Sequence, residues 1–115
     1  MKTYTVKEIT ALLDWKVIGG NQGLGKEVSG AYVADLLSDV MGHAQEGQIW
    51  ITMQAHKNVM AIASLRDLAA IVLVNGNQPD QDMLAQANEE GIPVLSTNLG
   101  TFDTAGQLYQ IIIAK

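Results

Sequence analysis

The sequence predicts an α/β fold, a single domain built on a mainly parallel sheet of four to five strands with helices on both faces. Its 115 residues suffice for one domain. From residue 48 onward, strand-type and helix-type patterns alternate with short connections. Residues 48–53 and 69–74 are apolar on both pleat faces, which is typical of strands covered by helices on both sides. Right-handed crossovers make such consecutive strands parallel.

The first half of the chain starts with a helix. Thr5 and Glu8 form a capping box, and an apolar stripe at helical spacing follows them. Residues 16–18 make a short strand, which runs into a glycine-rich loop at residues 19–25. Residues 28–33 form a second strand.

A second helix follows, capped by Asp35 and closing near Gly42 or Gly47. Residues 57–64 are apolar nearly all round, which predicts a buried helix between the two core strands.

Three further elements complete the pattern. A helix with Met83, Leu84 and Ala87 facing inward ends at Gly91, which serves as its left-handed cap. The remaining two elements are a short strand at residues 92–96 and a final helix from Asp103 to Ala114.

Composition excludes several classes of function. The chain has no cysteine, hence no disulfides, thiolate zinc site or cysteine nucleophile. Its net charge of −5 and lack of a Lys/Arg cluster argue against nucleic acid as a partner. The longest apolar run, residues 68–74, is far shorter than the roughly 20 residues that span a bilayer. With charged residues near the N-terminus instead of a signal peptide, we expect a cytoplasmic protein without membrane contact.

Low charge content predicts self-association. Charged residues make up 17% of the chain, against about 25% in an ordinary globular protein. A small domain with so few charges is expected to expose apolar surface, and a homodimer would cover it. Candidate interface residues are Trp50, Tyr109 and Ile113, although core packing is an equally good interpretation for Trp50.

Ligands of such sheets bind beyond the carboxyl ends of the strands. The loops expected there are residues 19–25, 54–58, 75–78 and 97–101. One candidate site for a nucleotide or another anion comprises five of their residues: His56, Lys57, Asn58, Asn75 and Gly76. Free N–H groups at a helix start and the charge of Lys57 favour an anion. The plainer alternative, which we favour, is a solvated helix cap in which His56 or Asn58 accepts backbone hydrogen bonds.

A near-match to a phosphate-binding loop occurs at Gly20, Gly25 and Lys26. The next residue should be Ser or Thr and should open a helix, but it is Glu27, and a strand follows. We therefore interpret residues 19–25 as a plain turn between two strands.

No catalytic or metal constellation is evident. The serines lack a nucleophile elbow, and no histidine is near them in sequence. His43 and His56 are 13 residues apart on separate elements, which is weak evidence for metal binding. Asp35 and Asp39 are spaced for one helix face, but a cap and a solvated charge explain them more simply. We expect no metal, no cofactor and no catalytic residue.

Four segments carry a family resemblance: residues 35–42, 49–52, 56–63 and 75–76. They resemble the DRTGG domain, most closely its small stand-alone bacterial versions, and the resemblance extends from about Val17 to Ile112. It implies that residues 1–115 form one α/β regulatory domain. Related modules occur in CBS-domain pyrophosphatases and phosphotransacetylases, and the N-terminal domain of HPr kinase/phosphorylase is similar. There they supply dimer contacts or regulatory coupling while other domains catalyse.

This chain departs from the motif that names the family. The Asp-Arg pair corresponds to Ala55-His56, and the Thr-Gly-Gly triplet to Val74-Asn75-Gly76, so that only Gly76 is retained. The spacing still fits one strand–helix–strand unit, which predicts that the two motif loops lie side by side.

Three functions follow as hypotheses. The leading one is a non-catalytic regulatory module, a homodimer that modulates a kinase or another metabolic partner. The second is a sensor of a nucleotide or anion, and the third and least favoured is a small enzyme. A histidine placed against Asp35 or Asp39 within a deep pocket would favour the enzyme.

Overall fold

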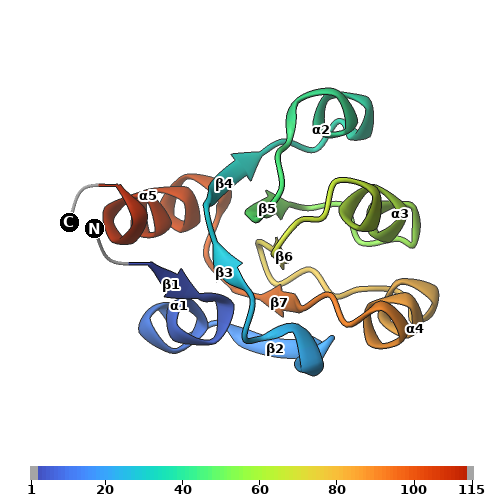
Figure 1. Ribbon diagram of the computed structural model, residues 1–115, viewed down its shortest axis with the longest axis horizontal. Coiled ribbons are helices and arrows are strands. Elements are labelled where there is room, and N and C mark those ends of the chain that lie inside the picture. The colour runs from blue at the N-terminus through green and yellow to red at the C-terminus, as the bar shows by residue number, and fades with distance from the viewer. Residues whose placement is uncertain (1–2, 114–115) are drawn as a thin grey trace.

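A five-stranded sheet between two layers of helices forms the centre of the molecule in a computed structural model that describes residues 3–113 (Figure 1). The elements in chain order are β1 (Tyr4–Thr5), α1 (Val6–Leu13), β2 (Lys16–Gly19), a 3-10 turn (Asn21–Gly23), β3 (Glu27–Val28), β4 (Gly30–Val33), α2 (Leu37–His43), β5 (Gln48–Thr52), α3 (Asn58–Leu65), β6 (Ala70–Leu73), α4 (Gln81–Glu90), β7 (Val94–Ser96) and α5 (Thr101–Ile112).

The strand order in the sheet is β2-β7-β6-β5-β4. Strands β4, β5, β6 and β7 are parallel, and β2 is antiparallel to β7 at one edge. Helices α1 and α5 cover one face of the sheet, and α2, α3 and α4 lie on the other side (Figure 1). The short strands β1 and β3 pair separately. The predicted α/β fold with a mainly parallel sheet and helices on both faces is confirmed.

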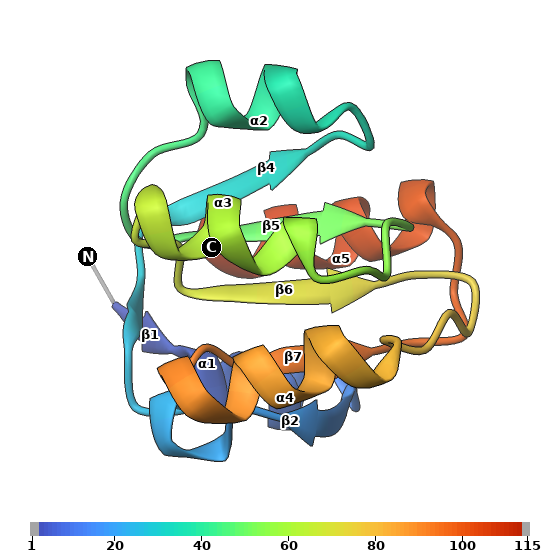
Figure 2. The ribbon, with the colours of Figure 1, turned by 90° about the vertical axis from the view of Figure 1, so that its right-hand side faces the viewer.

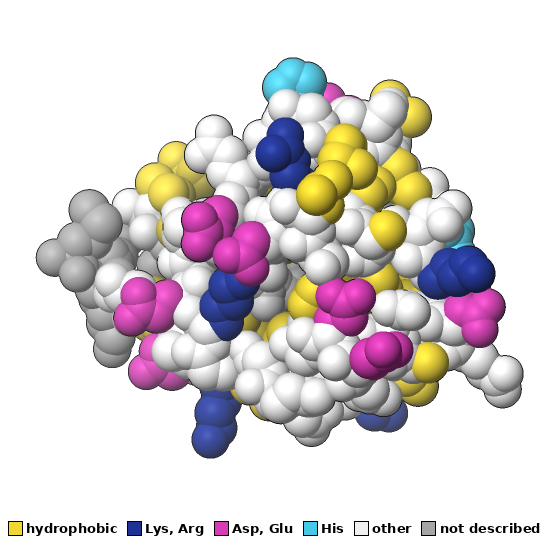
Figure 3. Space-filling view, turned by 45° about the vertical axis from the view of Figure 1, so that its right-hand side comes forward, with side chains coloured by type: hydrophobic (Ala, Val, Ile, Leu, Met, Phe, Trp, Pro, Cys, Tyr) yellow, Lys and Arg dark blue, Asp and Glu magenta, His cyan; other side chains and the backbone are white. Residues whose placement is uncertain are grey.

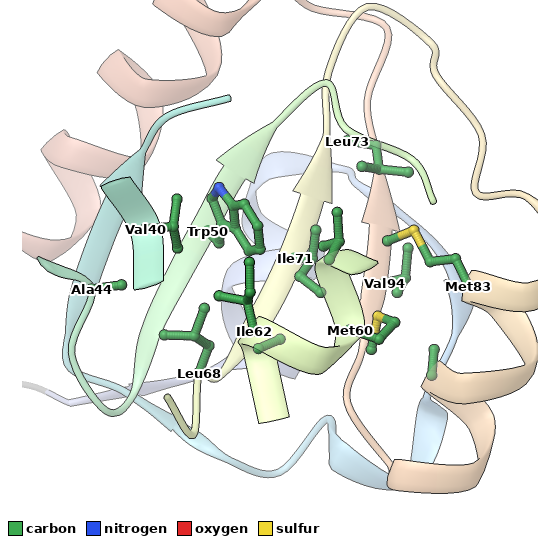
Figure 4. Packing of buried hydrophobic residues seen from close by; sticks show 13 residues of the cluster. Val40, Ala44, Trp50, Met60, Ile62, Leu68, Ile71, Leu73, Met83 and Val94 are labelled. Carbon is green, nitrogen blue, oxygen red and sulfur yellow. The ribbon is translucent and has the colours of Figure 1, made fainter. Parts of the chain in front are cut away.

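The central strands are buried on both faces, as their composition predicts. Along β5, Ile49 and Ile51 contribute to a core beneath α1 and α5, whereas Trp50 points into the core beneath α2, α3 and α4. Figure 4 shows Trp50 and Ile71 directed from the sheet toward the helices, among apolar side chains from β7 and the helices. All four residues of β6 are buried. Two apolar cores, one on each face, therefore hold the layers together.

Two predicted helix caps are confirmed. The Thr5 backbone N–H donates to Glu8 Oε1 at 2.9 Å, and the Glu8 N–H donates to Thr5 Oγ1 at 3.2 Å. Gly91 ends α4 with a φ of 69°, in the left-handed region that glycine adopts without a steric cost.

The predicted cap of the second helix is wrong. Helix α2 has Leu36 at its N-cap and no side-chain cap. The carboxylate of Asp35 instead accepts hydrogen bonds from the Thr52 hydroxyl and the Met53 N–H, both at 2.8 Å, at the end of β5. The Asp35 side chain therefore bonds to β5 and the residue after it, and it does not cap the helix that the local pattern predicts it to cap.

The predicted strand at residues 28–33 is two strands. Ser29 separates β3 from β4 and is bonded to the loop before β5, because its N–H donates to the Gly47 carbonyl at 2.9 Å and its hydroxyl to the Glu46 carbonyl at 2.8 Å. The final helix begins at Thr101, two residues before the predicted start. Its predicted end at Ala114 lies outside the described residues.

None of the helices within residues 3–113 is both long and apolar enough to span a bilayer.

Candidate functional site

The loops that follow β4, β5, β6 and β7 all lie at the carboxyl edge of the parallel sheet (Figure 2). The glycine-rich loop at residues 19–25 does not join them, which corrects the sequence-based expectation. Because β2 runs antiparallel to its neighbour, its carboxyl end lies at the opposite end of the sheet. The Gly20 N–H donates there to Asn88 Oδ1 of α4 at 2.8 Å.

The glycine loop has the structure of a turn and not of a phosphate cradle. Gly23 packs so closely on the end of α4 that a Cβ would lie 2.0 Å from the Gly91 carbonyl oxygen. The Lys26 ammonium forms an ion pair with Asp67 at 2.5 Å. The element that follows Lys26 is the strand β3 and not a helix. The interpretation as a plain turn is confirmed.

Three loops at the carboxyl edge are bonded to one another. The Asp80 N–H donates to the Ala55 carbonyl, which joins the β6–α4 loop to the β5–α3 loop at 2.9 Å. The N–H groups of Asn75 and Gly76 donate to the carbonyls of Leu99 and Thr97, each at 2.9 Å, which adds the β7–α5 loop. The prediction that the two motif loops lie side by side is confirmed.

The start of α3 differs from the cap that the sequence suggests. Lys57 is the N-cap residue, and no side chain caps the helix. The first turn is closed by the backbone, with the Val59 N–H donating to the His56 carbonyl at 3.0 Å. The alternative in which His56 or Asn58 accepts these hydrogen bonds through its side chain is therefore wrong.

Four of the five candidate ligand residues fall into two groups, and the fifth, His56, is half-buried in the bend before α3. Lys57 and Asn58 line a shallow groove of about 320 Å³ with residues of α4, among them Gln86 and Glu90. Asn75 and Gly76 instead form the tight turn after β6, with φ angles of 59° and 71°. The Asn75 side-chain amide contacts the Met53 sulfur at 3.4 Å.

Charge does not single out the groove beside α3 as an anion site. Glu90 places a carboxylate in the same groove as Lys57. On the face that carries α3 and α4, acidic and basic side chains are interspersed (Figure 3). An anion bound beside Lys57 would therefore also experience repulsion from Glu90.

One histidine does meet a carboxylate. His43 Nδ1 lies 3.2 Å from Asp39 Oδ1, and the Tyr32 hydroxyl donates to Asp39 Oδ2 at 2.7 Å. The hydrogen bond to this carboxylate raises the pKa of Tyr32 above its ordinary value. The His43 side chain is 69% exposed, so this pair lies on the open surface of α2 and not in a deep pocket. The condition set for the enzyme hypothesis is not met.

The described part of the chain brings no three His, Asp or Glu side chains together in a way that could hold a metal ion.

The three candidate interface residues also separate. Trp50 is fully buried, and its indole N–H donates to the Ala34 carbonyl at 2.8 Å, so its assignment to a surface is wrong. Tyr109 and Ile113 are each 59% exposed and lie on one side of α5. They border a groove of about 280 Å³ between α5 and β4.

The other wall of this groove, which we call the β4–α5 groove, was not predicted from the sequence. Its lining residues share an uncharged character, and they are Gly30, Ala31, Val33, Ile51, Ala105, Leu108, Tyr109, Ile112 and Ile113. Val33 is 46% exposed although it lies in the sheet. One signal for this wall was present in the sequence, because residues 30–33 carry no charge. The position of this strand at the edge of the sheet depends on the strand order, which the sequence does not show.

The mainly parallel sheet between two layers of helices, with joined loops at its carboxyl edge, defines a small three-layer α/β/α domain. The chain belongs to the DRTGG domain family, whose model matches residues 8–111. The resemblance noted from the sequence is thereby confirmed.

The chain is similar to parts of two larger proteins. The uncharacterized protein YtoI of Bacillus subtilis (strain 168) is 26% identical over 112 residues, which cover 94% of this chain and 24% of YtoI. The crystallised CBS and DRTGG domains of the regulatory region of Clostridium perfringens pyrophosphatase, complexed with the activator diadenosine tetraphosphate, have a TM-score of 0.68 and 20% identity, covering 94% of this chain and 46% of theirs. This chain thus spans about a quarter of YtoI and less than half of the crystallised chain.

Proposed function

We propose that this chain is a non-catalytic regulatory module that works as a homodimer and modulates an enzyme partner, such as a kinase or another metabolic enzyme. Membership of the DRTGG family supports a regulatory role, because the DRTGG domain of the similar pyrophosphatase lies in that enzyme's regulatory region. The exposed position of the His43–Asp39 pair supports a function without catalysis.

The observation that carries the proposal is the β4–α5 groove. All nine of its lining residues are uncharged at neutral pH in a chain of net charge −5. Tyr109 and Ile113 stand at its rim with more than half of their surface exposed. Burying an apolar side chain of this size contributes about 1.5–3 kcal/mol relative to leaving it exposed. A second subunit over this groove would recover that energy.

Light scattering after size exclusion tests the dimer. We expect the unmodified chain to elute at twice its monomer mass and the variant Tyr109→Glu to elute as a monomer, because the dimer would have to bury two unpaired carboxylates. Leu65→Glu is the matched control. Leu65 is 68% exposed on α3, on the opposite face of the sheet, so this variant adds the same charge away from the groove (Figure 1).

Three outcomes are decisive. A dimer lost in Tyr109→Glu and kept in Leu65→Glu supports the groove as the interface. A dimer that survives Tyr109→Glu rules the groove out. A chain that is monomeric at high micromolar concentration without any substitution contradicts the dimer itself.

A nucleotide or anion sensor is the second candidate function. It is favoured by the bonding of the β5–α3, β6–α4 and β7–α5 loops into one unit at the carboxyl edge, where ligands of parallel sheets bind. The similar pyrophosphatase region was crystallised with a dinucleotide activator, which suggests the class of compound to try first.

Thermal unfolding with diadenosine tetraphosphate, ATP, AMP and inorganic phosphate tests the sensor. A ligand at 100 times its Kd stabilises the folded state by about 2.7 kcal/mol, which raises the Tm of a chain of this size by about 10 °C. Lys57→Ala should reduce the shift, whereas Lys7→Ala on α1 serves as a control of equal charge change. The absence of any shift at millimolar ligand would exclude the sensor for these compounds.

A further inference from the structure

The strand β4 has one open edge. It is last in the sheet order and pairs in parallel with β5 on one side only. The Ala34 N–H donates to the Ile51 carbonyl of β5. Because backbone groups alternate along a strand, those of Gly30 and Tyr32 also face β5, and those of Ala31 and Val33 face the open edge.

This edge lacks the usual features that prevent strand pairing. Folded proteins protect edge strands with charged side chains, proline or bulges. The opposite edge strand β2 has two of these features, the exposed Lys16 and a register shift between Val17 and Gly19. The four residues of β4 include no charge and no proline, and their register with β5 is regular. The edge is therefore suited to pairing with another strand.

Charge and area both point to a second copy of this chain as the occupant. Two chains of net charge −5 repel each other, which favours contact through an uncharged surface, and the β4–α5 groove is such a surface. Two of its nine lining residues, Ile51 and Leu108, are buried and contribute almost no surface, so the groove alone falls short of the roughly 500 Å² per partner of a specific interface. The adjoining strand edge must contribute the rest.

We propose that two copies pair their β4 strands antiparallel about a two-fold axis at Tyr32, which joins their sheets into one. Ala31 of each copy lies opposite Val33 of the second copy, and each such pair exchanges two N–H···O bonds. Tyr32 lies opposite its own copy. This inference rests on the proposed dimer and specifies how its subunits meet.

The register follows from which backbone groups are free to bond. Two-fold symmetry requires the same surface on both copies. With the axis at Tyr32, both outward-facing residues, Ala31 and Val33, find outward-facing partners. An axis at Ala31 or at Val33 aligns only one of them with an outward-facing residue of β4. A shift of one residue between the strands would set outward-facing groups against inward-facing ones and form no ladder.

Disulfide cross-linking tests the register cleanly because the chain has no cysteine of its own. Ala31 and Val33 are both exposed, so Ala31→Cys and Val33→Cys are expected to fold. Hydrogen-bonded antiparallel pairs place Cα atoms about 5.5 Å apart, within the range that a disulfide spans. In the proposed register, two copies of Ala31 are displaced along the strands by two residues and lie beyond that range.

We expect an oxidised mixture of Ala31→Cys and Val33→Cys to form at least about tenfold more cross-linked dimer than either variant alone. Leu12→Cys, exposed on α1, controls for random collision. Efficient cross-linking of either variant with itself overturns the register. Absence of cross-linking in a sample that light scattering shows to be dimeric overturns strand pairing and leaves the proposed function standing. A monomeric sample overturns both.

Discussion

Asp35 and Thr52 join two neighbouring strands of the parallel sheet at the carboxyl edge. Asp35 Oδ1 accepts hydrogen bonds at 2.8 Å from the Thr52 hydroxyl, which is almost fully buried, and from the Met53 N–H. The Gln54 side-chain amide donates to the Asp35 carbonyl oxygen at 3.0 Å. One carboxylate residue thereby fixes the end of β5 to the loop that leaves β4.

Asp35→Ala should destabilise the fold by about 1–3 kcal/mol, because it leaves the buried Thr52 hydroxyl and the Met53 N–H without their acceptor. Urea unfolding followed by circular dichroism measures the change. Glu89→Ala, an exposed carboxylate on α4, serves as the control and should change stability by less than about 0.5 kcal/mol. If both variants unfold at the same urea concentration, the Asp35 contacts do not stabilise the fold.

Trp50→Phe should destabilise the chain by about 2–3 kcal/mol, because it removes buried volume and leaves the Ala34 carbonyl without its donor. The mass of the assembly in light scattering should stay unchanged, since Trp50 lies in the core between the sheet and its helices (Figure 4). A variant of normal stability that dissociates would instead return Trp50 to the interface.

Trp50 also shows what a sequence can and cannot predict here. The strand at residues 48–53 was predictable because apolar residues occupy both of its faces. A strand that is apolar on both faces does not indicate which of its side chains are exposed, since burial depends on the helices that cover each face. Tyr109 and Ile113 were identified because a helix with a second apolar stripe has more apolar surface than one contact needs.

The role of Asp35 as a helix cap and the position of the glycine loop at the carboxyl edge were mispredicted for a shared reason. Local patterns favour an aspartate as a helix cap and place a loop after each strand at the same edge. The bond from Thr52 to Asp35 joins residues 17 apart, and the antiparallel direction of β2 is set by its pairing with β7. Neither contact leaves a local pattern. The candidate ligand site near α3 stays a prediction, and the separation of its residues into two groups depends on α4, which forms the groove beside Lys57 and Asn58.

The ion pair between Lys26 and Asp67 should make stability depend on pH in acid. The hydrogen bond from Lys26 lowers the pKa of the Asp67 carboxyl below its ordinary value. Its contribution is thus complete above the unfolded pKa of about 3.9 and is lost as the pH falls through the lower folded pKa. Both side chains are partly exposed, so the contribution at neutral pH is at most about 0.5 kcal/mol.

Asp67→Asn is the suitable variant, because Asp67 has a φ of 54° and asparagine tolerates this left-handed conformation. Urea unfolding of the two proteins should differ at pH 7 and converge below about pH 4. Salt at about 1 M should also reduce the difference at pH 7. A difference that is constant across this pH range would show that the lost contact is not electrostatic.

Gly23→Ala and Gly25→Ala form a matched pair that tests the role of the glycine loop. A Cβ at Gly23 would lie 2.0 Å from the Gly91 carbonyl oxygen, whereas a Cβ at Gly25 would meet nothing within 4 Å. Gly23→Ala should therefore destabilise the chain by about 1–3 kcal/mol through forced movement of the α4–β7 connection. Gly25→Ala should be neutral or more stable by about 0.4–1 kcal/mol, since it reduces the freedom of the unfolded chain.

A phosphate-binding loop would behave differently, because both glycines would then be needed for a nucleotide-dependent rise in Tm and neither for the stability of the free chain. Thermal unfolding of both variants with and without ATP separates the two roles.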